Sequence, residues 1–156
     1  MTQNEIPPAA QQEAVALAAR TGARLVINAA PAPESPPPWY GNADPLVVNE
    51  HEAAQLAASN EAGAGLLRRL RERTGARSVV MTLGERGALV DDGTGVHAIP
   101  PVVVEQVVDA TGAGDTFVGV LAARLALGEG LVAAASAANR FAAEAVTWSG
   151  ARPPAE

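Results

Sequence analysis

The sequence predicts an α/β fold in which helices cover both faces of a mostly parallel β-sheet, giving three layers (αβα). Short, continuously apolar runs of strand length alternate with longer helical segments along the chain. Strands that are apolar throughout are typical of parallel sheets, because these sheets are buried on both faces. Of the 156 residues, 48% are hydrophobic, which is enough for the core of one domain.

The N-terminal part of the chain alternates helix, strand, loop and strand. Residues 8–20 predict a helix that ends at Gly22, because glycine is favoured just past a helix end. Residues 24–28 (RLVIN) are an apolar run of strand length. The prolines of 31–38 (PAPESPPP) exclude regular structure and predict a surface loop, and a second strand is expected at 45–49 (PLVVN).

The middle of the chain predicts two helices, a strand and a hairpin. The helices span 50–58 and 61–74, and the second is expected to bury its leucines and to expose its arginines to solvent. Residues 78–84 (SVVMTLG) form the next apolar strand. Residues 87–100 predict a hairpin with its turn at 92–95 (DGTG), because Asp-Gly pairs favour tight turns.

The C-terminal part begins with the β-branched residues 102–108 (VVVEQVV), which we expect to be extended. A helix is predicted over 113–127 and a last, alanine-rich one over about 130–147. The first of these helices repeats large apolar residues at i, i+4 and i+8, namely Phe117, Leu121 and Leu125.

Composition excludes several classes of function. The net charge of −6 argues against a protein that binds nucleic acid or an anionic membrane. The sequence has no cysteine, which excludes disulfides, Cys-ligated zinc and thiol catalysis and is consistent with a cytoplasmic protein. All eleven basic residues are arginine, so the lysine of a P-loop and the amine of Schiff-base chemistry are missing.

The stretch 109–128, DATGAGDTFVGVLAARLALG, carries the chemistry of the sequence. Gly112 and Gly114 permit a tight turn that brings backbone N–H groups to the start of a helix. The first amides of a helix lack intrahelical partners, so the turn predicts an anion hole. Asp115 lies in the first helical turn. From the spacing alone it is either an N-terminal cap or a general base that accepts a proton from an attacking hydroxyl.

The longer string DATGAGDTFVGVLAARLA resembles the C-terminal signature of the ribokinase (PfkB-type) carbohydrate kinases, usually written D-T-x-G-A-G-D-x-F. Further segments resemble the family in the same order along nearly the whole chain. They are NEIP (4–7), NAAPAPE (28–34), NEHE (49–52, the family's N-x-x-E), VVMTLGERGALV (79–90) and AAEAVTWSGARP (142–153). The resemblance is closest to ribokinase and implies a ribokinase-like fold.

The resemblance implies ATP-dependent phosphorylation of a sugar hydroxyl, with a pentose such as ribose as the expected substrate. Asp115 would be the general base. The backbone amides of Gly112, Ala113 and Gly114 would stabilise the transferring phosphoryl group, which suits a reaction that depends on positioning and charge neutralisation.

The resemblance also assigns a nucleotide and Mg²⁺ site. Asn49 and Glu52 would serve phosphate and hydrated Mg²⁺, and they lie at i and i+3 so that both can face one site. The alternative interpretation of this pair is a helix cap with its capping-box partner. The other residues assigned to ATP are Thr82, Gly84, Gly87 and Asn139. For the two glycines and Thr82, the alternative is a plain hairpin turn.

Family members often bind a monovalent cation such as K⁺ beside the anion hole. Asp109 and the carbonyl groups of Thr111, Trp148 and Gly150 fall at the matching positions, whereas Pro154 stands where ribokinases commonly have a small polar residue. The alternative interpretation of Asp109 is a brace for the turn.

Ribokinase-type chains are longer than this sequence, and their N-terminal half carries the Gly-Gly signature, the sugar-binding acidic residue and the β-lid. We therefore expect residues 1–156 to be the C-terminal, nucleotide-binding and catalytic half. Such a half exposes a sheet edge and apolar surface, which predicts poor solubility or homo-oligomers. The alternative function is a catalytically inactive nucleotide-binding fragment or gene remnant.

The remaining candidate residues have structural interpretations. His51 and His97 lack metal-ligand spacing and are expected at the surface. Trp39 and Tyr40 follow the proline run and are expected to anchor that loop.

Overall fold

The computed structural model describes residues 1–148 and 150. These residues form two compact units. Unit 1 contains residues 1–83 and 89–97, and unit 2 contains residues 84–88 together with the chain from residue 98 onward.

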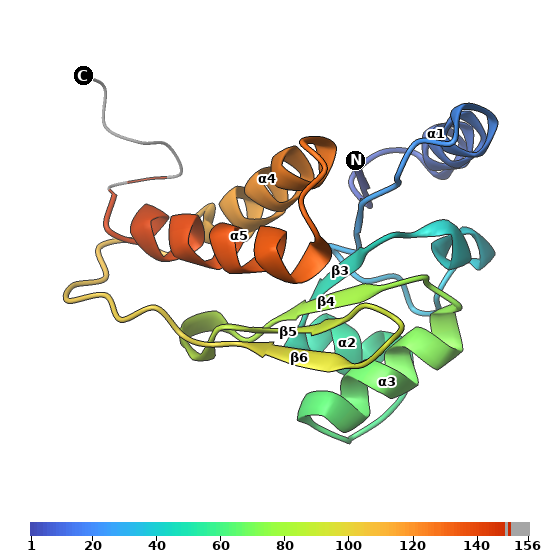
Figure 1. Ribbon diagram of the computed structural model, residues 1–156. Coiled ribbons are helices and arrows are strands. Elements are labelled where there is room, and N and C mark those ends of the chain that lie inside the picture. The colour runs from blue at the N-terminus through green and yellow to red at the C-terminus, as the bar shows by residue number, and fades with distance from the viewer. Residues whose placement is uncertain (149, 151–156) are drawn as a thin grey trace. The chain divides into compact units, whose positions relative to one another are not determined.

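Five α-helices, two 3₁₀ helices and six strands make up the described chain (Figure 1). The helices are α1 (Pro8–Thr21), η1 (Pro38–Asn42), α2 (Glu50–Ala57), α3 (Gly63–Thr74), η2 (Gly84–Arg86), α4 (Ala113–Ala126) and α5 (Leu131–Ala145). The strands are β1 (Thr2–Gln3), β2 (Ile27–Asn28), β3 (Leu46–Asn49), β4 (Val79–Thr82), β5 (Ala88–Asp91) and β6 (Val96–Ile99).

The strands form one sheet in the order β1-β2-β3-β4-β5-β6. The first four strands are parallel, so their carboxyl ends meet at one edge. The register places Gln3 beside Asn28, Asn28 beside Val47, and Asn49 beside Thr82. The sheet therefore brings polar residues that are distant in the sequence to one edge.

The core of unit 1 lies on one face of this sheet. Alternate strand residues point to this face and meet the apolar sides of α2 and α3, whose Leu66, Leu67 and Leu70 are buried as predicted. The intervening residues Val47 and Val80 are also buried, although they point to the other face. Burial on both faces is what the continuously apolar strands predict.

The structure differs from the sequence-based expectations in three segments. Strand β1 was not expected, and residues 24–28 provide only the two-residue strand β2. Residues 102–108 contain no strand, and the side chain of Val103 is 92% exposed. The preceding Pro100 and Pro101 supply no backbone N–H for a sheet ladder, so β-branched composition alone does not make this segment a strand.

A polar network anchors the segment that contains η1, as predicted for Trp39 and Tyr40. Asn4 Nδ2 donates to Tyr40 Oη and to the Pro31 carbonyl oxygen, each at 2.7 Å. Gln11 Nε2 donates to Asn4 Oδ1 at 2.9 Å, and Trp39 Nε1 donates to Gln11 Oε1 at 3.2 Å. Burial raises the pKa of the Tyr40 phenol because it disfavours the charged form. The network joins the end of β1 to α1 and η1.

Two aspartates fix the predicted hairpin turn at its base. Asp91 is buried and accepts a hydrogen bond from the Gly93 N–H at 3.0 Å. Its Oδ1 lies 3.8 Å from Arg71 Nε, so Arg71 is not simply solvated as expected for the arginines of this helix. Asp92 Oδ1 accepts from the Thr94 N–H at 2.9 Å and from the Thr94 hydroxyl at 2.8 Å.

We expect the Asp92 turn to lose its contribution to stability in acid. Hydrogen bonds from the Thr94 hydroxyl and N–H lower the pKa of Asp92 from 3.8 to about 2. A lowered folded-state pKa gives stability that is complete above the unfolded-state value and is lost as the pH falls through the folded-state value. Urea unfolding should therefore show a difference between the native chain and Asp92→Asn that shrinks from about pH 5 to about pH 2. An unchanged difference would contradict this role.

His97 Nε2 lies 3.1 Å from Asp92 Oδ2 and is partly exposed.

Unit 2 contains the helix pair α4 and α5. Phe117, Leu121 and Leu125 of α4 are buried, as their spacing predicts, and Leu131 of α5 is buried as well. Arg124 Nη1 lies 2.8 Å from Glu129 Oε1 across the connection between the helices. None of the described helices has the length and apolarity needed to cross a bilayer.

Candidate active site

The glycine turn of unit 2 has the geometry that its sequence predicts. Gly112 has φ +80° and precedes α4 as its N-cap residue. This conformation favours glycine because it has no Cβ. The Gly112 carbonyl oxygen accepts from the Thr116 N–H at 2.8 Å, which fixes Ala113 and Gly114 in the first turn of the helix. The amino end of α4 is therefore formed by small residues that leave the backbone accessible.

Asp115 lies in the first turn of α4 and is exposed. The helix has no side-chain cap hydrogen bond, so the capping interpretation of Asp115 is wrong. Within the described part of the chain, no hydrogen bond or ion pair engages its carboxylate. A carboxylate beside the positive end of a helix and open to solvent can accept a proton from a bound hydroxyl.

Asp109 braces the entry to this turn. Its Oδ1 accepts from the Thr111 N–H at 2.8 Å, and its Oδ2 accepts from the Gly150 N–H at 3.3 Å. Hydrogen bonds from Thr111 lower the pKa of Asp109. Three of the predicted cation ligands are thus brought together, and Trp148, whose N–H donates to the Ala145 carbonyl at 3.1 Å, belongs to the same segment as Gly150. Pro154 lies outside the described residues.

Two of the predicted nucleotide residues, Gly87 and Asn139, lie against one segment of unit 2, and Gly84 is hydrogen-bonded to Gly87. Gly84 and Gly87 have φ +60° and +88° and bound η2, and the Gly87 N–H donates to the Gly84 carbonyl at 3.2 Å. A Cβ on Gly87 would overlap the Ile99 carbonyl oxygen and lie 3.0 Å from the Pro100 carbonyl carbon. On the same segment, Asn139 Nδ2 donates to the Pro100 carbonyl oxygen at 3.0 Å. The two glycines lie in the short connection between the neighbouring strands β4 and β5, which agrees with the turn of the structural alternative.

Asn49 and Glu52 form a capping box at the start of α2, in unit 1. Asn49 Oδ1 accepts from the Glu52 N–H, and Glu52 Oε2 accepts from the Asn49 N–H, both at 2.8 Å. The structural alternative for this pair is therefore confirmed. It leaves Asn49 Nδ2 and Glu52 Oε1 outside the box. Thr82 lies beside Asn49 in the β-ladder, and its hydroxyl is 3.4 Å from the Val48 carbonyl oxygen.

The side chains at this edge suit a hydrated Mg²⁺ ion better than a metal ion held by protein ligands alone. Within residues 1–148 and 150, no three His, Cys, Asp or Glu side chains gather as they would in a protein-only metal cage. Mg²⁺ keeps several waters and is commonly held by one or two carboxylates together with phosphate oxygens. One half-buried carboxylate, Glu52, with one oxygen outside the box, is consistent with that requirement.

Replacing Asn49 by Ala should destabilise unit 1 by about 1 kcal/mol, because the Glu52 N–H loses its acceptor. Asn49→Ser should restore most of this stability, since serine is an equally good N-cap. Urea unfolding of the two variants and the native chain measures the difference. Equal stability of the Ala and Ser variants would show that the capping box contributes nothing measurable.

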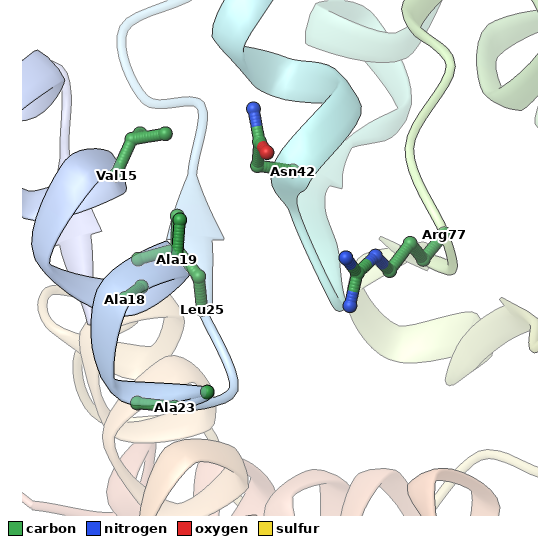
Figure 2. A pocket seen from close by; sticks show the side chains of 8 residues that line it. Val15, Ala18, Ala19, Ala23, Leu25, Asn42 and Arg77 are labelled. Atoms are coloured by element: carbon green, nitrogen blue, oxygen red, sulfur yellow. The ribbon is translucent and has the colours of Figure 1, made fainter.

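Each unit has a hollow on its surface. In unit 2, residues 102–108 and α5 line an open groove of about 490 Å³. In unit 1, a hollow of about 120 Å³ places Arg77 and Asn42 opposite the small side chains of α1 (Figure 2). Arg77 and Leu25 precede β4 and β2, so the smaller hollow lies at the amino edge of the sheet. Ligands of parallel sheets bind at the carboxyl edge.

Sequence reasoning missed the network of Asn4, Gln11 and Tyr40, because its members come from three separate segments. It also missed the groove along residues 102–108, because these residues were expected to form an extended segment. The signal available for the groove was the run of valines directly after two prolines.

Comparisons with known proteins identify relatives along the whole chain. The family model described as pfkB family carbohydrate kinase matches residues 1–156. Ribokinase from Mus musculus is 38% identical over 129 residues, which cover 80% of this chain and 40% of the mouse protein. The crystal structure of ribokinase from Thermotoga maritima is 27% identical with a TM-score of 0.82, and the match covers 96% of this chain and 50% of that one. Ribokinase from Cryptococcus neoformans var. grubii in complex with ADP is 25% identical with a TM-score of 0.81, covering 96% and 54%.

These likenesses confirm the predicted three-layer, ribokinase-like α/β fold. The chain spans about half the length of the relatives it matches.

Proposed function

Since the chain belongs to the pfkB family of carbohydrate kinases, we propose that it forms the nucleotide-binding and catalytic part of a ribokinase-like sugar kinase. The observation that carries this proposal is the turn from Gly112 to Asp115, where an exposed, unpartnered carboxylate stands beside the amino end of α4. Small residues leave the amides of that helix end open to an anion.

The proposed reaction transfers the γ-phosphoryl group of ATP to a sugar hydroxyl. Asp115 accepts the hydroxyl proton while the hydroxyl oxygen forms a bond to the γ-phosphorus. The bond from the γ-phosphorus to the β,γ-bridging oxygen breaks, and ADP leaves with that oxygen. The amides at Gly112, Ala113 and Gly114 stabilise the charge on the transferring group, which is the main catalytic contribution in phosphoryl transfer.

ATP binding is proposed at the residues that the family pattern assigns. Gly87 and Asn139 border the Ile99–Pro100 segment, and Gly84 is hydrogen-bonded to Gly87. The groove of about 490 Å³ has the size and valine lining that suit a nucleobase. Phosphate oxygens and Mg²⁺ would be held near Asn49, Glu52 and Thr82. When bound, Mg²⁺ would neutralise charge on the phosphates.

The sugar and the cation are the least specific parts of the proposal. Relatives named ribokinase support a pentose such as ribose as the phosphoryl acceptor. A monovalent cation such as K⁺ would bind at Asp109, Thr111, Trp148 and Gly150, where Asp109 already orders the turn through its hydrogen bonds to Thr111 and Gly150.

Calorimetry of ATP binding with Mg²⁺, on the chain as given and on Asp115→Asn, tests the proposal. We expect both proteins to bind ATP with similar affinity, because Asp115 acts on the acceptor and not on the nucleotide. Absence of binding to both would contradict the proposal and leave the chain as an inactive relative of sugar kinases. Binding that is lost only in Asp115→Asn would show that Asp115 holds the nucleotide and is not the base.

A further inference from the structure

The carboxyl edge of unit 1 carries a polar side chain, that of Asn28, which the proposed function does not use. Asn28 ends β2 and pairs with Gln3 of β1 on one side and Val47 of β3 on the other. Two residues beyond Val47 lies Asn49, beside Thr82 of β4. By ordinary strand spacing, the Cα atoms of Asn28 and Asn49 are roughly 8 Å apart. Asn28 therefore continues, toward β1, the same edge that carries the proposed phosphate residues.

The side chain of Asn28 points to the same face of the sheet as those residues. Its neighbours Ile27 and Ala29 are fully buried in the core on the opposite face, and successive strand residues alternate between faces. Asn28 itself is half-buried, whereas Val26 and Val47, on the same face, are buried. This places its amide at the rim of the edge and not in the core.

The Asn28 amide is not needed by the fold. Among the described residues the side-chain amide of Asn28 makes no hydrogen bond. The side-chain amide of Asn4, in contrast, donates two hydrogen bonds and accepts two. A half-buried amide with a free donor and a free acceptor gains more from a ligand than a fully solvated one.

The backbone that follows Asn28 is held from two sides. Asn4 Nδ2 donates to the Pro31 carbonyl oxygen at 2.7 Å. Gln55 Nε2, from α2, donates to the carbonyl oxygens of Ala32 and Pro33 at 3.3 and 3.1 Å. These bonds fix the start of the NAAPAPE segment, and a site residue on fixed backbone pays less ordering entropy on binding.

We propose that Asn28 contacts the phosphoryl acceptor and recognises one of its hydroxyl groups; this inference rests on the proposed function. Along the edge, β3 and β4 carry the proposed phosphate residues, so an acceptor that meets the γ-phosphate there extends toward β2 and β1. The charge of that region favours the same ligand. Gln3, which pairs with Asn28, donates from its Nε2 to Glu5 Oε2 at 3.0 Å. A carboxylate close to a neutral amide suits a ligand with hydroxyl groups better than a polyanion.

The test follows the side-chain amide of Asn28 by ¹H–¹⁵N NMR as ribose is added to the chain. We expect the Asn28 cross-peaks to shift, and ribose affinity to fall about three- to tenfold in Asn28→Ala, as for the loss of one hydrogen bond. ATP affinity should stay within about twofold of the native chain, since the amide does not contact the phosphates. Asn60→Ala, at an exposed asparagine of unit 1, is the control and should change neither affinity.

The outcomes separate this inference from the proposed function. Unmoved Asn28 cross-peaks, or equal ribose affinity in Asn28→Ala and the native chain, overturn the role of Asn28 even if ATP binds. Asn28→Asp adds a further test, because a new carboxylate would repel phosphate. If this variant weakens ATP binding more than ribose binding, Asn28 belongs to the nucleotide site and the inference is wrong. If the native chain does not bind ATP, the proposed function is contradicted instead.

Discussion

Replacing Asp115 by Asn is expected to slow phosphoryl transfer to the sugar by about 10²- to 10⁴-fold, the usual contribution of a general base. Asparagine keeps the shape of the side chain but cannot accept the hydroxyl proton. Because Asp115 is exposed and engages no described residue, the substitution should leave folding intact. A coupled-enzyme assay of ADP release, with ATP, ribose and Mg²⁺ present, gives kcat. Thermal unfolding verifies that the variant is folded.

Glu72→Gln is a suitable control for this experiment. Glu72 is an exposed carboxylate of α3 in unit 1, so its loss removes the same charge without touching the glycine turn or the proposed ATP site. We expect Glu72→Gln to keep native activity. If both variants keep native activity, proton transfer to Asp115 does not limit the reaction. If both variants lose activity to the same extent, the change in net charge is the cause.

Gly87→Ala is expected to destabilise the chain strongly. At φ +88° any Cβ is strained, and here the Cβ would also overlap the Ile99 carbonyl oxygen, which belongs to backbone and cannot rotate away. Strain and overpacking together cost about 3 kcal/mol. In thermal unfolding this corresponds to a Tm lower by roughly 6–12 °C for a chain of this size.

The neighbouring glycine separates the two causes. Gly84 also has positive φ, at +60°, but a Cβ there would meet nothing within 4 Å. Gly84→Ala should therefore cost only the conformational strain, about 1 kcal/mol. If Gly84→Ala and Gly87→Ala prove equally stable, the close approach between Gly87 and Ile99 does not exist in solution.

The elements that the sequence predicts well are those whose signals are local. Gly22 and Gly75 end α1 and α3 in the left-handed conformation, as glycine after an amphipathic stretch predicts. The hairpin turn and the buried stripe of α4 follow from equally local patterns. The glycine turn before Asp115 could be predicted for the same reason, since its geometry depends on adjacent residues.

The features that could not be predicted depend on residues far apart in the sequence. Strand β1 has two residues, too few to show a period, and exists because the Thr2 N–H donates to the Val26 carbonyl oxygen at 3.0 Å. The position of Asn28 follows from the β-sheet register, which a single sequence does not specify. For Asn49 and Glu52, the spacing allowed both a capping box and a phosphate site, and only the structure shows that the box forms.

The division into two units gives this chain a built-in pair of fluorescent reporters. It has two tryptophans: Trp39 is tied to Gln11 in unit 1, and Trp148 follows α5 in unit 2. Replacing one or the other by Phe leaves an emission signal from a single unit. Matching denaturation midpoints from the two variants would mean that the units unfold in one cooperative step, whereas separate midpoints would assign each unit its own stability.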